Sequence, residues 1–194
     1  EQLRHNQRDI DEAALKSIPQ PYNPCHCASQ KKFKFCCRPI FNYIVEAMCA
    51  AEDGLHEEAL DWMAKAEKIV GKTAEVLCRK AIVYSFIDKQ QYAKYLQECL
   101  EVNPKHPRAH YLQGIDLYKK GDYELAIAAY LRAIQYYCST DHYHLNEAYN
   151  NLGQVYHQMG EHTKAIKAWK TALEHSPTDR MARENLQKFG ASHK

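Results

Sequence analysis

The chain has 194 residues, of which 45% are hydrophobic and 26% are charged. This composition is typical of a globular protein, and it excludes a generally disordered chain. Lysine and arginine number 26 against 24 aspartates and glutamates, so the formal net charge is only +2. A charge this balanced excludes a protein that binds nucleic acid or an anionic membrane with its whole surface.

The positions of the cysteines and the lengths of the apolar runs indicate in which cellular compartment the protein is expected. Four of the eight cysteines lie within 13 residues, and the other four are scattered through helical patterns, as buried thiols would be. We therefore expect a reducing, cytoplasmic compartment rather than a disulfide framework. No apolar run approaches the roughly 18 residues of a membrane span, and no apolar stretch follows the first charges as it would in a secretory signal.

Residues 1–21 form the first predicted segment. Ala13 to Leu15 mark the end of a short predicted helix, and three prolines between Ile18 and Pro24 predict an extended, stiff linker after it. The first residue is not methionine, so an accessory domain of a larger enzyme also stays open as an interpretation.

Residues 22–39 carry the cluster of cysteines. Two short pairs are separated by eight residues, Cys25 and Cys27 before the gap and Cys36 and Cys37 after it. Zn²⁺ prefers four soft ligands in a tetrahedron, and two pairs that flank one turn can supply them. Two local disulfides or four free thiols are the alternatives. A bridge between the adjacent Cys36 and Cys37 would be strained, and exposed free thiols are a liability.

This spacing resembles the SEC-C motif, a small zinc module found at the tail of the SecA translocation motor and in other, mostly bacterial, proteins. The residues between the pairs that also match are Ser29, Lys31, Lys32, Phe33 and Lys34. The resemblance implies one structural zinc ion, held by Cys25, Cys27, Cys36 and Cys37. The sequence departs from the motif with His26 where proline is usual, and with Ala28 and Gln30 where glycine eases a tight turn. His26 is a reserve ligand that we expect to point away, because it lies between two cysteines.

The same segment is basic. Residues 22–40 hold three lysines and one arginine but no acid, and four thiolates with one Zn²⁺ would leave a net charge of about +2. Phosphate contacts and base stacking on the phenylalanines would suit RNA or a ribosomal surface, with contacts from Lys31, Lys32 and Lys34. The alternative is that the lysines neutralise the zinc–thiolate cluster and the phenylalanines pack on the helix that follows.

From Ile40 onward, apolar residues recur at helical spacing and the pattern repeats itself. Two glycines seven residues apart occur twice, as Gly114 with Gly121 and as Gly153 with Gly160. A small–aromatic–small pattern follows each pair, at Ala126, Tyr130 and Ala133 and at Ala165, Trp169 and Ala172. The small residues let a preceding helix approach, and the aromatic ring fills the gap between them.

Weaker copies of this pattern start at Tyr43 and Val76. Four helical hairpins are therefore predicted, at about 40–72, 73–106, 107–140 and 146–179. An insert of about five residues near Ser139 to Leu145 interrupts the period. Residues 180–194 are predicted to form a capping helix with a polar outer face and a tail.

These hairpins resemble the tetratricopeptide repeat, which has a period of about 34 residues. The best match comprises Tyr149, Leu152, Gly153, Tyr156, Ala165, Trp169, Ala172 and Pro177. The preceding repeat departs from it, with His110, Gln113, Gly114 and Leu117. The resemblance covers about 140 residues. It implies an all-α fold, a right-handed superhelix of four hairpins plus a capping helix.

In this family the first helix of each hairpin lines a concave groove that binds a peptide or protein. The resemblance places the partner-binding residues at Tyr84, Tyr111, Leu112, Tyr118, Asn150, Asn151 and Gln154. Tyrosine gives contact area at low entropic cost, and side-chain amides can pair with a peptide backbone. The alternative is that residues 1–22 or the zinc module cover this face, because an apolar patch of this size is unusual in a monomer.

Some proteins of this family clamp the C-terminal carboxylate of a chaperone with a lysine, asparagine and arginine set. Ile44, Leu77 and Tyr111 stand where the lysine of that set would lie, so we do not predict a clamp.

The sequence shows no pattern typical of catalysis: no Ser/His/Asp set, no glycine-rich phosphate loop and no paired carboxylates. We expect no enzyme. Four histidines lie near one another in repeat register, His142, His144, His157 and His162, and they are expected to be solvated or capping residues rather than metal ligands. Cys49, Cys78 and Cys99 are expected to be packing thiols. The predicted function is a non-catalytic scaffold or adaptor for a protein or peptide partner, and the alternative is a ribosome- or nucleic-acid-associated factor.

Overall fold

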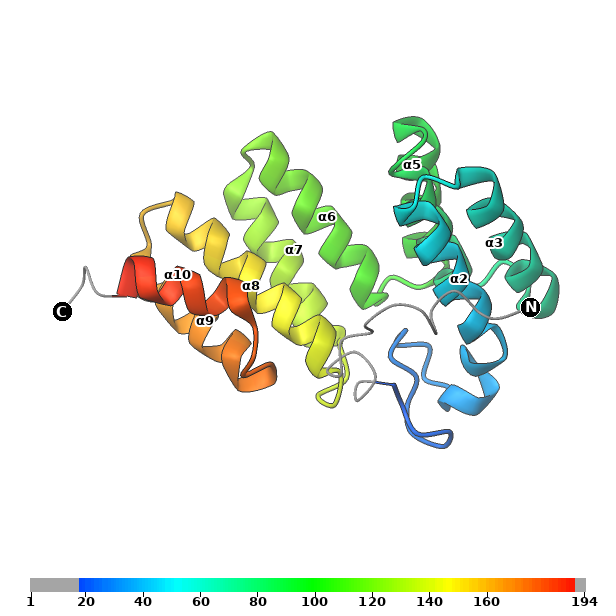
Figure 1. Ribbon diagram of the computed structural model, residues 1–194, viewed down its shortest axis with the longest axis horizontal. Coiled ribbons are helices and arrows are strands. Elements are labelled where there is room, and N and C mark those ends of the chain that lie inside the picture. Colours follow the sequence, from blue (N-terminus) through cyan, green and yellow to red (C-terminus); the bar gives the residue numbers. More distant parts are fainter. Residues whose placement is uncertain (1–17, 191–194) are drawn as a thin grey trace. The chain divides into compact units, whose positions relative to one another are not determined.

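The computed structural model describes residues 18–190, and all regular structure in this range is helical (Figure 1). The predicted all-α class is confirmed. Between residues 18 and 190 the only extended pairing is an isolated antiparallel bridge between Pro24 and Lys32. Among the described residues the chain divides into two compact units, one formed by Pro19–Ala109 and the other by Ile18 with residues 110–190, and each is described by itself. The short helix predicted before Leu15 lies outside the described residues.

The first unit begins with a small non-helical module that contains two 3₁₀ turns, η2 (Phe33–Phe35) and η3 (Arg38–Ile40). Two helical hairpins follow. The first consists of α2 (Phe41–Glu52) and α3 (His56–Val70), and the second of α4 (Ala74–Tyr84) and α5 (Lys89–Val102). Side chains cap the second hairpin: Thr73 Oγ1 accepts a hydrogen bond from the backbone N–H of Val76, and Asp88 Oδ1 accepts from the N–H of Gln90 and Gln91.

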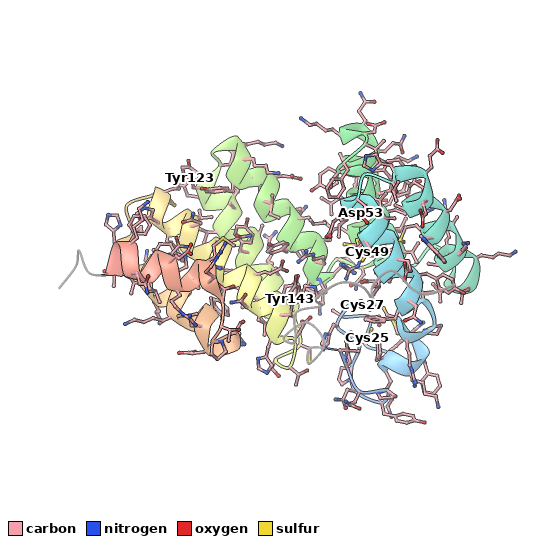
Figure 2. The ribbon with its side chains drawn as sticks, in the orientation of Figure 1. Cys25, Cys27, Cys49, Asp53, Tyr123 and Tyr143 are labelled. Atoms are coloured by element: carbon pink, nitrogen blue, oxygen red, sulfur yellow. The ribbon has the colours of Figure 1, made fainter. Side chains whose placement is uncertain are left out.

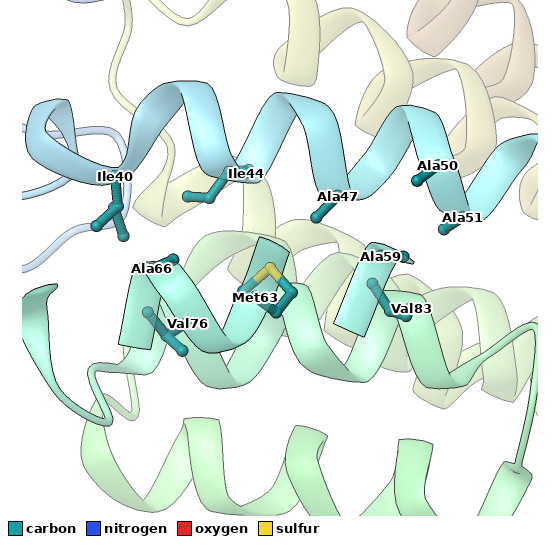
Figure 3. Packing of buried hydrophobic residues seen from close by; sticks show 10 residues of the cluster. All are labelled: Ile40, Ile44, Ala47, Ala50, Ala51, Ala59, Met63, Ala66, Val76 and Val83. Carbon is teal, nitrogen blue, oxygen red and sulfur yellow. The ribbon is translucent and has the colours of Figure 1, made fainter. Parts of the chain in front are cut away.

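Small residues hold the first hairpin together. Figure 3 shows Ala47 and Ala50 of α2 turned toward α3, where Met63 fills the space between Ala59 and Ala66. All five side chains are fully buried. Met63 occupies the position that an aromatic residue holds in the later repeats, which explains why this repeat is harder to recognise in the sequence.

The second unit contains the better-matched hairpins. Its helices are α6 (Pro107–Lys120, from residue 110 onward), α7 (Tyr123–Tyr136), α8 (His142–Gln158), α9 (His162–His175) and α10 (Arg180–Gly190). The turn between each pair has its glycine in the left-handed region, with φ of 84° at Gly121 and 77° at Gly160. A side chain in that conformation would be strained, so these turns require glycine.

In each hairpin of the second unit, a glycine of the first helix packs against a large ring of the second helix. Tyr130 and Trp169 are 1% and 0% exposed. A Cβ atom on Gly153 would lie 2.4 Å from Trp169 Nε1, and one on Gly114 would lie 2.7 Å from Tyr130 Cε1. The Trp169 indole donates a hydrogen bond of 3.2 Å to the Asn150 carbonyl. The predicted small–aromatic–small packing is therefore confirmed, with the facing glycine as its counterpart.

The insert near Ser139 to Leu145 lies in the connection between α7 and α8 and in the first turn of α8, which begins at His142. The buried Asp141 accepts a hydrogen bond from the N–H of His144 there. One local prediction differs from the structure. The segment before Pro24 is not extended throughout, since the N–H of Asn23 donates to the Gln20 carbonyl and closes a turn.

None of the helices in the range 18–190 combines the length and the apolar character needed to cross a membrane.

The contact between Gly153 and Trp169 makes a double-mutant cycle informative. Gly153→Ala should lower the free energy of unfolding by roughly 1–3 kcal/mol through overpacking, and Trp169→Ala should lower it by roughly 3–5 kcal/mol through a cavity. Because the clash disappears with the ring, the double variant should be no less stable than Trp169→Ala alone. Chemical denaturation measures all three, with the exposed Gln158→Ala as control. Additive losses would contradict this packing.

Candidate functional site

The four clustered cysteines converge in the N-terminal module, where Figure 2 labels Cys25 and Cys27. Cys27 Sγ lies 3.5 Å from Cys25 Sγ and 3.5 Å from Cys36 Sγ, and the sulfurs of Cys36 and Cys37 are 3.7 Å apart. A Zn–S bond of about 2.3 Å at the tetrahedral angle separates sulfurs by about 3.8 Å. None of the four forms a disulfide, and all four sulfurs lie within 4.8 Å of one another. Their spacing therefore fits one tetrahedral ion, and His26 is not part of the group.

Backbone hydrogen bonds fold the chain around this cluster. The N–H of Cys25 donates to the Lys31 carbonyl at 2.9 Å, and the N–H of Phe33 donates to the Asn23 carbonyl at 2.9 Å. The η2 turn then places Cys36 and Cys37 beside the first pair. Phe33 is buried and packs edge-on against Phe41 of α2, at 6.0 Å between ring centroids. The module is thus anchored on the first hairpin.

The turn between the two cysteine pairs holds the only non-glycine residues with positive φ between residues 18 and 190. They are Ala28, at 55°, and Gln30, at 62°. These are the two positions where the resemblance leads one to expect glycine. A side chain costs roughly 1–2 kcal/mol in this left-handed conformation, so the module keeps the turn in spite of local strain.

Protons are unevenly shared among the four thiols. Hydrogen bonds with Cys25, Cys27 and Cys37 lower the pKa of Cys36, and the Ser29 hydroxyl, 3.0 Å from Cys36 Sγ, adds to this effect. Hydrogen bonds among the thiols, together with burial, raise the pKa of Cys27 and Cys37. A cation that replaces the shared protons would relieve this competition.

The candidate nucleic-acid residues Lys31, Lys32 and Lys34 are all exposed on the module. Lys34 Nζ donates a hydrogen bond of 2.9 Å to the Tyr22 hydroxyl, and Lys32 Nζ lies 5.6 Å from the centre of the Tyr22 ring. Tyr22 and Phe35 are 59% and 65% exposed. Lys32 and Lys34 therefore lie beside exposed aromatic rings, whereas Phe33 packs on the hairpin.

Two of the predicted partner-binding residues have side chains that are buried in the second unit. Tyr111 is 6% exposed, lies edge-on to Tyr130 and accepts a hydrogen bond of 2.9 Å from Asn151 Nδ2. Asn150 is 4% exposed, and its Nδ2 donates to Asp179 Oδ1 at 3.2 Å. Because both side chains are buried, we leave Tyr111 and Asn150 out of the proposed binding surface, although Asn150 Oδ1 has no hydrogen-bond partner.

The other predicted residues are half-buried. In the second unit, Leu112 and Tyr118 lie on α6, and Asn151 and Gln154 lie on α8. The carbonyl oxygen of the Gln154 side chain is enclosed and has no hydrogen-bond partner. We refer to these four residues as the α6–α8 face. In the first unit, Tyr84 stacks on Tyr95 with ring centroids 5.2 Å apart.

The four histidines do not form a metal cluster. His142 pairs with His175, and His144 contacts the Asp141 carboxylate at 2.8 Å. The rings of His157 and His162 are 5.3 Å apart. Within the described range, only one other group of side chains could hold a metal, formed by Cys78, Cys99 and His106. Sequence reasoning assigned those cysteines to packing and passed over His106, because α4, α5 and the next loop meet only in the folded chain.

Comparison with known proteins supports the fold. Family models of the tetratricopeptide repeat match residues 93–139 and 147–179, and neither reaches the cysteine cluster. These two segments are tetratricopeptide repeats. No curated protein sequence matches the chain.

Solved structures share the same fold at low identity. A chain in the crystal structure of the APC/C hetero-tetramer Cut9–Hcn1 gives a TM-score of 0.67 at 19% identity, over 81% of this chain and 31% of that one. PilF of Pseudomonas aeruginosa gives 0.61 at 21% identity, over 77% and 68%. The first TPR of Spaghetti (RPAP3), bound to the HSP90 peptide SRMEEVD, gives 0.53 at 18% identity, over 62% and 93%. The present chain thus spans about a third of the Cut9–Hcn1 relative. These identities establish the fold alone.

The strained turn of the cysteine module leads to a direct test. Ala28→Gly and Gln30→Gly should each stabilise the module by about 0.5–1 kcal/mol, because glycine removes the left-handed strain but adds entropy to the unfolded chain. Hydrogen exchange of residues 22–39 measures the effect. Ser29→Gly, between the two positions but with ordinary backbone, serves as the control and should not stabilise. Faster exchange in both glycine variants would contradict the strain.

Proposed function

We propose that the protein is a non-catalytic scaffold that binds an extended segment of a protein partner on the α6–α8 face, and that a structural zinc ion organises its N-terminal module. The observation that carries the first part is the half-buried Gln154 side chain, whose carbonyl oxygen has no hydrogen-bond partner. This oxygen would turn outward to accept from a ligand N–H, and that bond would remove the cost of leaving the acceptor unpaired.

The chemistry of the α6–α8 face suits an extended peptide. Leu112 and Tyr118 supply apolar and aromatic contact from α6, while Asn151 and Gln154 supply amides from α8. An extended backbone presents N–H and C=O groups in alternation, and a side-chain amide can pair with both. A peptide occupies the related fold of the first TPR of Spaghetti. We do not extend its chaperone ligand to this chain, because Ile44, Leu77 and Tyr111 replace the expected lysine.

The groove proposal is tested with a displayed library of unstructured random peptides. Gln154→Ala with Tyr118→Ala should weaken the binding of the selected peptides by roughly 2 kcal/mol or more, as expected for the loss of a binding hot spot. The thermal midpoint should fall less than it would on loss of a core side chain, since both residues are half-buried and Tyr118 only borders the core cluster. Lys170→Ala, an exposed change on α9, is the control.

Peptides that bind the double variant as tightly as the parent would contradict the α6–α8 face as the site. A library that yields no binder at all would contradict the scaffold function itself.

The zinc proposal rests on the sulfur spacing and on the resemblance to the SEC-C motif. Four protein sulfurs would complete the coordination of the ion and leave no open position, which favours a structural role. With no sheet and only two 3₁₀ turns in the module, the ion would supply much of its stability.

Elemental analysis of protein purified without added metal tests this part. Cys36→Ser with Cys37→Ser should lower the zinc content by one ion per chain and loosen residues 22–39. The helices of the second unit should stay protected from hydrogen exchange, because they form a separate compact unit. Cys138→Ser, a half-buried cysteine of that unit, is the matched control. Zinc content unchanged by the double substitution would contradict the module.

A second candidate is a ribosome- or nucleic-acid-associated factor. The exposed rings of Tyr22 and Phe35 among exposed lysines favour it, since this is the pattern of a stacking surface for single strands. Salt dependence separates the two functions. Binding of single-stranded RNA through three lysines would weaken steeply as salt rises, whereas apolar and amide contacts with a peptide would not.

A further inference from the structure

Two cysteines and one histidine meet in the interior of the first unit. Cys78 lies on α4, Cys99 lies on α5, and His106 lies in the loop that follows α5. All three side chains are 0% exposed. Their two sulfurs and one imidazole nitrogen lie within 4.8 Å of one another. Soft sulfur and imidazole donors converging at one buried point are the ligand set of a thiophilic metal.

The surroundings of His106 resemble those of a metal ligand. Its Nε2 lies 3.0 Å from Glu75 Oε2, and the other oxygen of Glu75 accepts a hydrogen bond of 2.7 Å from Arg79 Nε. Nδ1 accepts a hydrogen bond from the N–H of Ala109, so the ring proton that faces the Glu75 carboxylate lies on Nε2. The lone pair then resides on Nδ1. A carboxylate on one imidazole nitrogen is the usual way to orient the other toward a metal.

We propose that Cys78, Cys99 and His106 bind a second metal ion, Zn²⁺, in the interior of the first unit. The charge favours a divalent ion. Two thiolates and Zn²⁺ sum to zero, and the charge of Glu75 is balanced by Arg79. A monovalent ion such as Cu⁺ would leave one uncompensated negative charge in a buried site, which is costly.

Packing alone explains part of this cluster but not all of it. Buried cysteines are common, and the N–H of Ala109 donates to His106 Nδ1 at 3.3 Å, as at a helix start. Helix capping, however, needs neither two sulfurs beside the ring nor a buried carboxylate behind it. At 3.3 Å the bond to Ala109 is longer than the bonds of His106 to Glu75 and Asn103, both 3.0 Å, and it is the one that a metal on Nδ1 would replace.

The loop that carries His106 also supports the N-terminal module. Asn103 Nδ2 donates a hydrogen bond of 3.0 Å to the Cys27 carbonyl, and the N–H of His106 donates to the Asn103 carbonyl at 3.0 Å. An ion on His106 would therefore fix the loop on which the first cysteine cluster rests. Metal binding at the second site would thus stabilise the contact between this loop and the first cysteine cluster.

Native mass spectrometry and elemental analysis of the full chain test the proposal. The parent should carry two zinc ions per chain. A variant with serine at all four positions of the N-terminal cluster should keep one, and Cys78→Ser added to that variant should remove it. His106→Gln in the parent should lose one ion of two, and Cys138→Ser should lose none.

Each other outcome has a definite meaning. A parent with one ion that the four-serine variant loses would overturn the second site and leave the zinc module standing. A parent with one ion that Cys78→Ser loses would support the second site and contradict the module. If the serine variants fold poorly, cobalt titration of the parent and of His106→Gln decides: two equivalents that develop thiolate-to-cobalt absorption in the parent support the second site, and saturation at one equivalent, with absorption unchanged by His106→Gln, overturns it.

Discussion

The close approach of the two helices in each hairpin is the constraint on which the rest of the structure depends. In the second unit this approach is set by a glycine against a ring, Gly114 against Tyr130 and Gly153 against Trp169. A Cβ atom on either glycine would lie 2.4–2.7 Å from a ring atom, closer than van der Waals contact allows, so the first helix keeps its glycine turned toward the ring. This orientation determines which residues remain on the opposite side. The placement of Leu112, Tyr118 and Gln154 is thus a consequence of core packing.

The same packing explains how much of the fold could be predicted. Small–aromatic–small spacing is visible in the sequence because the chain must supply both the gap and the side chain that fills it. Where Met63 replaces the aromatic residue, the gap is filled by a flexible side chain and the pattern weakens, although the hairpin is equally well buried. The start of α8 within the insert is set by Asp141, which caps the helix, and the burial of an acidic residue cannot be inferred from local spacing.

The binding face shows the limit of reasoning from register. Repeat alignment correctly places Tyr111 and Asn150 on the first helices of their hairpins, but a position on a helix does not specify what its side chain contacts. Tyr111 is held by Asn151, and Asn150 is held by Asp179, which begins the final helix. Both partners are distant in sequence. A polar residue that hydrogen-bonds to a distant partner cannot be told in the sequence from one that is free. Only the folded chain therefore distinguishes packing residues from ligand-binding ones.

The two cysteine groups differ in the same way. Cys25, Cys27, Cys36 and Cys37 are brought together by one local turn, so their spacing alone predicts a site, and the positive φ at Ala28 and Gln30 shows how strongly the turn is enforced. Cys78, Cys99 and His106 come from two helices and a loop, and only tertiary packing unites them. The loop Asn103–His106 joins the groups, since Asn103 contacts the module and His106 enters the core. The irregular segment after α5 thereby ties the N-terminal module to the second hairpin, whose helices supply Cys78 and Cys99.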